Sequence, residues 1–438
     1  MKRVAILGYG VSGKAAYRAL QTQGCDIYVF DEGLKKSNID KSFFGKDAKK
    51  FYDFEFDEIV VSPGIKKSHP FIVYALNKNI PVISELELGF RLSKCPVVAI
   101  TGTNGKTTTV SLIEKIMKAN NKKAVACGNY GYPITQAVLE NDNLDYLIVE
   151  ASSYQLEFID TFKPFIASIL NIGFDHLKWH GSLDEYKKTK LNIFKNQDKD
   201  CFFIKNSEDD YSYNGKATLL EFSRNRENSD CFLGIDKVVV NYKSKDIIKN
   251  VRLFGYGNAE NIAVSMLVSR ICNLNGKITK EVVEKMENLP HRLEFIGEID
   301  GVKYYNDSKS TNIDSVVNAL NSFEGNNIVL ILGGKYKGES FSKIVDLLKE
   351  KTRAVVVYGE DKKYLMNDLE KLIPIPLPAV NIKGAVVAAF EVAAKGDIVL
   401  FSPGGASCKP YKNFEERGEA FKKEFEAYKD YYENTPGI

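Results

Sequence analysis

The chain has 438 residues, of which 44% are hydrophobic, and its formal net charge is +3. This length suggests roughly three domains of about 150 residues, each with enough apolar side chains for its own core. The basic residues form no long block, which argues against nucleic acid as a partner. Seven scattered cysteines without a C-x-x-C pair favour a reducing compartment and argue against structural zinc. We find neither a signal-peptide pattern nor an apolar run of about 18 residues, and therefore expect a cytoplasmic protein without a membrane span.

The first glycine-rich segment follows the apolar run Val4–Leu7. Gly8, Gly10 and Gly13 stand in G-x-G-x-x-G order, and Asp31 ends the next apolar run. This pattern is typical of dinucleotide-binding folds, but such glycines admit any pyrophosphate to the helix N-terminus. The ligand is therefore either a nicotinamide cofactor or some other phosphate compound.

A second glycine-rich segment, "PVVAITGTNGKTTTVSLIEKIMKA", reads as strand, loop and helix. The loop presents backbone N–H groups, a lysine and a hydroxyl to a polyphosphate and its magnesium ion. The general motif requires glycine at position 100, where this chain has Ile100, so the loop is two residues shorter. A dehydrogenase needs no such loop, so the second loop favours an ATP site and weakens the case for NAD at the first loop.

Polar residues follow two later apolar runs. Glu150 ends "DYLIVE", while Asp175 and His176 follow "ASILNIGF". Carboxylate and imidazole groups at strand ends beside a phosphate loop suit Mg²⁺, which takes few protein ligands together with phosphate oxygens.

Short, continuously apolar runs alternate with helical patterns along most of the chain, as in buried parallel sheets. We predict an α/β protein of three domains with mostly parallel, doubly wound sheets: Rossmann-like first and last domains around a P-loop ATPase-like central domain. The predicted boundaries are 1–92, 93–289 and 290–438. Residues of about 200–257 suggest an insertion, in which "CFLGIDKVVVNYKSKDIIKNVRLFG" predicts antiparallel hairpins. The stretch "NFEERGEAFKKEFEAYKDYYEN" predicts a closing helix.

Several motifs together resemble the Mur ligase family, and within it the members that add D-glutamate. They are "TGTNGKTT", "EASSYQLE", "NIGFDH", "YKKTKLNIF", "PHRLEFIGEIDGVKYYNDSKSTN" and "SPGGAS" with "YKNFEERG". The resemblance implies ATP-dependent joining of D-glutamate to UDP-N-acetylmuramoyl-L-alanine (UDP-MurNAc-L-Ala) through an acyl phosphate, in peptidoglycan precursor synthesis. It implies ATP, two Mg²⁺ ions and a carbamylated lysine at Lys190, small-molecule substrates and no obligate protein partner.

The resemblance also assigns residues to each ligand. The ATP site comprises Gly102, Thr103, Asn104, Gly105, Lys106, Thr107, Thr108, Asn261, His291, Arg292 and Asp307. The UDP-sugar site comprises Gly10, Val11, Ser12, Asp31, Glu32, Ser62, Pro63, Gly64, Asn129, Ser152 and Gln155. The D-glutamate site comprises Lys309, Thr311, Lys337, Ser407 and Phe414. The metal ligands are Thr107, Glu150, His176 and Lys190, and the catalytic residues are Lys106, His176 and Lys190.

Two other functions compete with this hypothesis. A sister ligase, above all folylpolyglutamate synthase, shares the short loop but needs no complete glycine-loop unit at residues 1–92. A nucleotide-gated binding protein would hydrolyse ATP without depending on an amino acid. The chain departs from the family pattern at Asp31-Glu32-Gly33, at Gly257 and at Cys408-Lys409.

Overall fold

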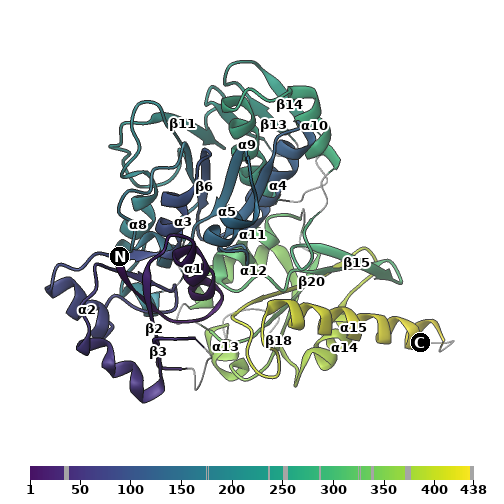
Figure 1. The fold of residues 1–438 in the computed structure, drawn as a ribbon. Coiled ribbons are helices and arrows are strands. Elements are labelled where there is room, and N and C mark those ends of the chain that lie inside the picture. The colour runs from purple at the N-terminus through teal and green to yellow at the C-terminus, as the bar shows by residue number, and fades with distance from the viewer. Residues whose placement is uncertain are drawn as a thin grey trace. The chain divides into compact units, whose positions relative to one another are not determined.

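The computed structural model describes residues 1–33, 39–173, 175, 177–234, 237–249, 255–285, 288–323, 325, 327–336, 340–369 and 376–434. Within these residues the strands form three sheets of five, nine and six strands. Most neighbouring strands are parallel, and helices connect them, so the predicted α/β class with three doubly wound sheets is confirmed (Figure 1).

The first sheet is entirely parallel. Its strands have the order β3-β2-β1-β4-β5, which is the order 3-2-1-4-5-6 of a dinucleotide-binding fold without the last strand. They are β1 (Arg3–Leu7), β2 (Asp26–Asp31), β3 (Ser42–Phe44), β4 (Glu58–Val61) and β5 (Val82–Ser84). The helices are α1 (Val11–Thr22), the 3₁₀ helix η1 (Gly45–Asp53), α2 (Pro70–Asn77) and α3 (Glu85–Leu92).

Strand β1 shows why its sequence is continuously apolar. Val4 and Ile6 pack into one hydrophobic cluster, whereas Ala5 and Leu7 pack into another. Alternate residues point to opposite faces of a strand, so both faces of this sheet are buried.

The second sheet has the order β14-β13-β12-β11-β10-β9-β6-β8-β7. Its strands are β6 (Val97–Thr101), β7 (Ala124–Gly128), β8 (Tyr146–Glu150), β9 (Ile166–Ile169), β10 (Phe202–Asn206), β11 (Thr218–Ser223), β12 (Cys231–Leu233), β13 (Lys237–Val240) and β14 (Asp246–Lys249). Its helices are α4 (Lys106–Ala119), α5 (Ile134–Glu140), α6 (Ser153–Leu156), α7 (Leu177–His180), α8 (Leu183–Leu191), the 3₁₀ helix η2 (Asn192–Phe194), α9 (Gly255–Ile271) and α10 (Gly276–Lys285).

The predicted hairpin insertion at about 200–257 is only partly right. Strands β12, β13 and β14 form an antiparallel meander, as expected. Strands β10 and β11 instead pair in parallel with β9 and with each other, so they extend the central sheet. Phe203 and Ile204 are both fully buried on opposite faces of β10, which is the burial pattern of a sheet interior rather than of a surface hairpin.

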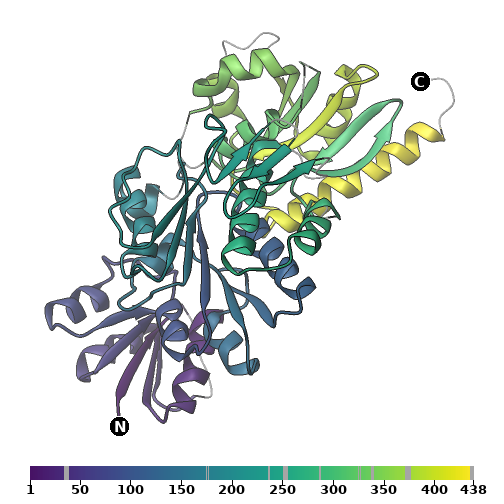
Figure 2. The ribbon, with the colours of Figure 1, turned by 90° about the horizontal axis from the view of Figure 1, so that it is seen from above.

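The third sheet has the order β15-β16-β20-β17-β18-β19, in which only β15 and β16 are antiparallel. Its strands are β15 (Glu294–Ile299), β16 (Val302–Asn306), β17 (Ile328–Gly333), β18 (Thr352–Tyr358), β19 (Leu377–Pro378) and β20 (Ile398–Gly404). Its helices are α11 (Ile313–Leu320), the 3₁₀ helix η3 (Phe341–Ile344), α12 (Val345–Lys351), α13 (Lys362–Asp368), α14 (Ile382–Val392) and α15 (Phe414–Glu433). The predicted closing helix is α15, the long yellow helix in Figure 2, and it packs Phe425 against Tyr304 of the hairpin β15–β16.

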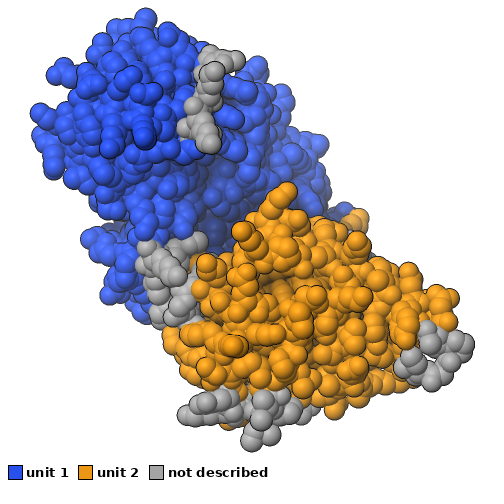
Figure 3. Space-filling model, turned by 90° about the horizontal axis from the view of Figure 1, so that it is seen from below, with its two compact units in different colours: residues 1–172, 179–250, 260–284 blue, residues 173–178, 251–259, 285–438 orange. Residues whose placement is uncertain are grey.

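The chain divides into two compact units, which Figure 3 colours separately. Unit 1 holds residues 1–172, 179–250 and 260–284, and unit 2 holds residues 173–178, 251–259 and 285–438. The first and second sheets thus lie in one unit, and the domain boundaries at 92/93 and 289/290 stay a prediction.

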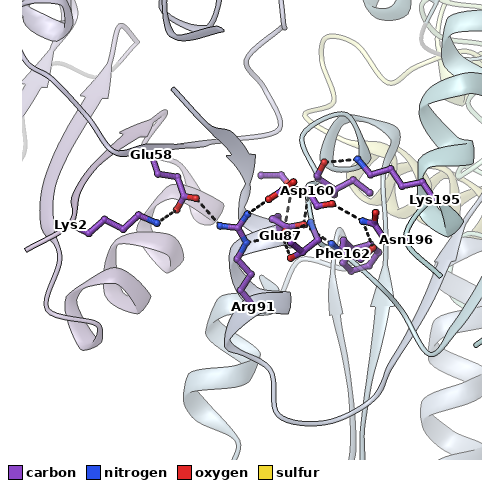
Figure 4. A network of polar contacts seen from close by, with 11 residues as sticks. Lys2, Glu58, Glu87, Arg91, Asp160, Phe162, Lys195 and Asn196 are labelled. Atoms are coloured by element: carbon purple, nitrogen blue, oxygen red, sulfur yellow. Dashed lines mark hydrogen bonds and ion pairs between the residues drawn. The ribbon is translucent and has the colours of Figure 1, made fainter. Parts of the chain in front are cut away.

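Within unit 1, helix α3 fastens the first sheet to the second through a polar network (Figure 4). Arg91 donates to Glu58 of β4 and to Glu87 at 2.7 Å each, and to Asp160 at 3.0 Å. The fully buried Glu87 also accepts from the backbone N–H groups of residues 160, 161 and 162. Charge-assisted bonds of this number hold the two sheets together more firmly than an exposed ion pair would.

Candidate active site

The first glycine loop of unit 1 depends on two of its glycines for its shape. Gly8 has φ +83°, a conformation that L side chains rarely adopt, and a Cβ atom on Gly13 would lie 2.0 Å from the Gly8 carbonyl oxygen. Asp31 holds the loop from the end of β2, because its carboxylate accepts from the N–H of Tyr9 at 2.7 Å and from that of Gly33 at 2.8 Å. The loop and the start of α1 therefore have the backbone geometry that suits a phosphate group, and the role of the loop stays a prediction.

A cavity of about 500 Å³ opens at the carboxyl ends of β1, β2 and β4. Of the predicted residues, Asp31, Glu32 and Gly64 line it. The structure adds Lys66, Ser68, His69 and Trp179, which the sequence analysis missed. The cluster of basic residues that follows "SPG" at 62–64 could have indicated Lys66 and His69. His69 Nε2 lies 3.2 Å from a carboxylate oxygen of Glu32.

Other residues assigned to the UDP-sugar are used for local structure. Ser62 Oγ donates to the Gly8 carbonyl oxygen at 2.9 Å, so it supports the loop. Ser152 and Gln155 are buried and form a reciprocal capping box at the start of α6. Gly10, Val11 and Ser12 lie at the start of α1, and Pro63 follows β4 next to Ser62.

The second glycine loop joins β6 to α4 and brings two lysines to one carbonyl oxygen. Gly102 and Gly105 have φ +153° and +85°, and Gly105 is the N-cap residue of α4. Lys106 Nζ donates to the Gly102 carbonyl oxygen at 2.7 Å, and Lys190 Nζ of α8 donates to the same oxygen at 2.9 Å. Lys190 is 1% exposed, and its Nζ lies 4.6 Å from the centre of the Tyr186 ring. Two cations at one helix N-terminus favour a polyanion there.

Beside this loop, three predicted residues form an oxygen-rich cluster. Thr107 Oγ1 donates to Glu150 Oε2 at 2.9 Å, and Asn129 Nδ2 donates to Glu150 Oε1 at 2.9 Å. Glu150 is only 3% exposed. A hydroxyl and a carboxylate beside a phosphate loop are the ligands that Mg²⁺ takes when phosphate and water complete its shell, so these residues fit the ion.

Side chains from the segment after β9 and from α9 also form hydrogen bonds that hold the loop. The backbone N–H of Asn104 donates to Asn171 Oδ1 at 2.9 Å, and Asn171 Nδ2 donates to Glu260 Oε2 at 3.2 Å. Arg224 in turn donates to Glu260 at 2.5 Å. Burial raises the pKa of Glu260 to about 7, although Arg224 and Asn171 act in the opposite direction.

Three more predicted ATP residues touch the loop region. Asn261 accepts from Thr109 Oγ1 at 3.0 Å, and a Cβ atom on Gly105 would lie 2.3 Å from its amide oxygen. Thr103 Oγ1 lies 3.3 Å from the Tyr186 hydroxyl, and Thr108 is buried in α4. The structure therefore brings the predicted ATP residues of unit 1 together at the end of β6.

In unit 2, the predicted residues gather where β16 and β20 end. Asp307 follows β16 and accepts from Ser402 Oγ at 2.8 Å. Burial raises the pKa of Asp307 to about 7. Asn306 Nδ2 donates to His291 Nδ1 at 3.0 Å, and burial lowers the pKa of the His291 imidazole. Lys309 Nζ lies 3.9 Å from the centre of the Phe414 ring.

The sequence analysis missed Arg417 of α15, which organises this end of unit 2. The side chain is 1% exposed and donates to Ser308 Oγ, the Ser308 carbonyl oxygen and the Gly405 carbonyl oxygen at 2.6–3.1 Å. It thereby ties the segment that carries Lys309 and Thr311 to the segment that carries Ser407. The Ser407 hydroxyl is buried and has no hydrogen-bond partner in the described part of the chain.

Two of the residues assigned from the family resemblance, His176 and Lys337, lie outside the described residues. Arg292, which was assigned to the ATP site, is half-buried. In the ranges that the structure describes, no three His, Cys, Asp or Glu side chains gather as a ready-made metal cluster. None of the described helices is both long and apolar enough to cross a bilayer.

Comparison with known proteins agrees with this geometry. Three family models match in order along the chain: the Mur ligase MurD-like N-terminal domain at residues 2–84, the Mur ligase middle domain at 100–269, and the Mur ligase glutamate ligase domain at 291–405. Solved structures share the fold at low sequence identity. A MurF ligase from Thermotoga maritima in complex with ADP has a TM-score of 0.64 at 18% identity, covering 97% of this chain and 95% of its own. A Mycobacterium tuberculosis folylpolyglutamate synthase has a TM-score of 0.58 at 14% identity, covering 77% of this chain and 92% of its own.

Curated relatives are much more similar in sequence. The UDP-N-acetylmuramoylalanine--D-glutamate ligase of Natranaerobius thermophilus is 36% identical, with 95% of this chain and 96% of the relative covered. The protein of the same name from Aquifex aeolicus is 36% identical, with 95% of this chain and 97% of the relative covered. Identity of this level over nearly the whole length means that the chain belongs to the Mur ligase family.

Proposed function

We propose that the protein joins D-glutamate to UDP-MurNAc-L-Ala at the expense of ATP, in the cytoplasmic synthesis of peptidoglycan precursors. The observation that carries this proposal is the presence of two separate phosphate loops in unit 1. One borders a cavity of nucleotide size, and the other presents Lys106, Thr107 and Glu150. The curated relatives that match nearly end to end bear the name of this activity.

The chemistry requires an activated carboxylate. The substrate carboxylate attacks the γ-phosphorus of ATP, the bond to ADP breaks, and an acyl phosphate forms. The amine of D-glutamate then attacks the acyl carbon, loses a proton, and inorganic phosphate leaves from the tetrahedral state. Lys106 and the N–H groups at the start of α4 bind and orient the transferred phosphoryl group.

The residues near the second loop fit a bound Mg²⁺ ion, which neutralises charge on the phosphates. Thr107 and Glu150 would hold it, and we assign His176 and Lys190 as further ligands, with two ions in total. As an ammonium, Lys190 adds a second cation beside Lys106 at the Gly102 carbonyl oxygen. Addition of its neutral amine to CO₂ yields a carbamate, which exchanges this positive charge for a negative one with two oxygens. We therefore propose a carbamylated Lys190.

The remaining assignments follow the two units. In unit 1, the cavity beside Asp31, Glu32 and Gly64 takes the UDP-sugar, and Asn129 faces Glu150 at the phosphate loop. In unit 2, Asp307, His291 and Arg292 contact the nucleotide, whereas D-glutamate is held by Lys309, Thr311, Lys337, Ser407 and Phe414. We also propose the three-domain division at 1–92, 93–289 and 290–438.

A sister amide ligase is the main alternative, because the folylpolyglutamate synthase fold is similar. The complete glycine-loop unit with its own cavity in the first sheet favours a nucleotide-sugar over a folate.

The test is product mass and phosphate release after mixing the protein with ATP, Mg²⁺, UDP-MurNAc-L-Ala and a panel of amino acids. We expect phosphate release only with both UDP-MurNAc-L-Ala and D-glutamate, and a product heavier by one glutamyl residue. Turnover with a folate and L-glutamate, or ATP hydrolysis that ignores the amino acid, would overturn the proposal.

A further inference from the structure

Trp179 is the single tryptophan of the chain, and it lines the cavity of the first sheet. The other lining residues lie between positions 7 and 71, so the indole comes to this cavity from the segment that follows β9.

The indole is held in place by neighbours of its own unit. The Tyr154 ring lies 4.5 Å from it, centre to centre, and Trp179 Nε1 donates to Glu157 Oε2 at 3.4 Å. Lys66, which also lines the cavity, has its Nζ 5.5 Å from the indole ring. A supported aromatic surface therefore stands beside a cation at the cavity wall.

The two ends of the cavity suit different halves of a nucleotide-sugar. Asp31 ends β2 and Glu32 follows it, at the position where a carboxylate of this fold meets ribose hydroxyls. The opposite half of the ligand must extend towards the phosphate loop of the second sheet, because that loop activates its carboxylate. Trp179 is the lining residue that belongs to the chain segment of the second sheet.

We propose that Trp179 and Lys66 form the sugar-diphosphate end of this cavity, with the indole packed against the sugar ring and the Lys66 ammonium paired with the diphosphate. An indole offers a large apolar surface to the C–H face of a sugar, and a lysine acts as a point charge towards phosphate. This inference rests on the proposed function, because it takes the UDP-sugar as the ligand.

The experiment compares UDP with UDP-MurNAc-L-Ala by calorimetry on four variants. Trp179→Ala should weaken binding of UDP-MurNAc-L-Ala about tenfold, roughly 1.4 kcal/mol, and leave UDP binding within about twofold. Trp179→Phe, which keeps a ring for stacking, should retain most of the affinity. Lys66→Met should weaken both ligands about tenfold, whereas the matched control Lys67→Met, whose side chain is exposed and does not line the cavity, should weaken neither.

Fluorescence of the wild-type protein is a second measurement, since emission comes from one known residue. UDP-MurNAc-L-Ala should shift it and UDP should not. Equal weakening of UDP and UDP-MurNAc-L-Ala by Trp179→Ala would place the indole against the uridine and overturn the inference. Unchanged binding of both ligands would also overturn it. In either case the proposed function stands, provided that the wild-type protein binds the nucleotide-sugar. If the wild-type protein binds no uridine nucleotide, both proposals fall.

Discussion

Glu85 and Glu87 lie two residues apart in the first turn of α3, and their surroundings shift their pKa values in opposite directions. Burial raises the pKa of Glu85 to about 7, and the Thr135 hydroxyl and N–H only partly offset this. Burial also acts to raise the pKa of Glu87, but donors from Thr161, Asp160 and Arg91 outweigh it, so the pKa falls below its ordinary value. Glu87 has more hydrogen-bond donors than Glu85, among them the charged Arg91, and these donors reverse the effect of burial on its pKa.

Glu85 should therefore lower the free energy of unfolding of the protein, and it should do so more strongly as the pH rises. A carboxyl group whose folded-state pKa is raised binds more protons when folded, so its cost is absent below its ordinary pKa of 4.5 and complete above about 7. We expect the unfolding free energy of Glu85→Gln, relative to wild type, to rise by up to about 3 kcal/mol between pH 5 and pH 8. Urea unfolding at several pH values measures this.

Glu87→Gln is the matched control for that measurement. It weakens the bonds to Arg91 and to three backbone N–H groups, so it should destabilise the protein at pH 8 and less at low pH. A parallel pH profile for the two variants would contradict the assignment.

Removal of the phosphate-loop lysine should separate chemistry from nucleotide-sugar binding. Lys106→Ala should lower turnover about a hundredfold or more, because the transferred phosphoryl group loses its cation. Binding of UDP-MurNAc-L-Ala should change by less than about tenfold, since its cavity is lined by other residues. Calorimetry and phosphate release decide this.

Lys118→Ala serves as control for Lys106→Ala. Lys118 lies on the same helix and forms an exposed pair with Glu114, so its loss should leave both quantities unchanged. A large loss of nucleotide-sugar affinity in Lys106→Ala would mean that the two loops are assigned to the wrong ligands.

The proposed carbamate at Lys190 predicts chemical rescue. At an effective dielectric constant of about 20, two like charges roughly 4 Å apart repel by about 4 kcal/mol, so an ammonium is unfavourable beside Lys106 and a metal ion. Lys190→Ala should be nearly inactive, and acetate but not methylamine should restore part of the activity. Lys188→Ala is the control, because Lys188 is an exposed residue of the same helix and its loss should leave the activity unchanged.

Two results count against the carbamate. One is wild-type activity in unsupplemented Lys190→Ala. The other is failure of acetate to restore activity together with an unmodified mass at Lys190 under saturating bicarbonate.

The support of the phosphate loop from β9 and α9 predicts a selective effect on ATP. Asn171→Ala removes both the acceptor for the Asn104 N–H and the donor to Glu260. We expect kcat/KM for ATP to fall about tenfold, roughly the value of one or two hydrogen bonds, with unchanged binding of UDP-MurNAc-L-Ala. Asn120→Ala, at the far end of α4, should lower stability without this effect. An equal fall of kcat/KM for ATP in Asn171→Ala and Asn120→Ala would exclude a positioning role of Asn171.

The elements that could be predicted from local sequence were the buried parallel strands and the two glycine loops. Continuous apolar runs identified β1, β2, β6, β8 and β9, because a strand buried on both faces needs apolar residues at every position. Gly8, Gly13, Gly102 and Gly105 were recognisable because only glycine fits their backbone conformations or contacts. The family motifs supplied most site residues in both units, and their roles stay predictions.

The tertiary structure alone decided which distant residues meet. The parallel pairing of β10 and β11 depends on which strand edge is available, and no local pattern contains that information. Trp179 and Lys66 lie outside the recognised motifs, and Arg417 stands in "YKNFEERG" without an assigned role. Their positions follow from long-range contacts, such as that of Trp179 with Glu157 across 22 residues and that of Arg417 with Ser308 across 109. Likewise Glu85 and Glu87 are the same type of residue, and only the burial and the donors that the folded chain provides around each carboxylate make the pKa of one high and that of the other low.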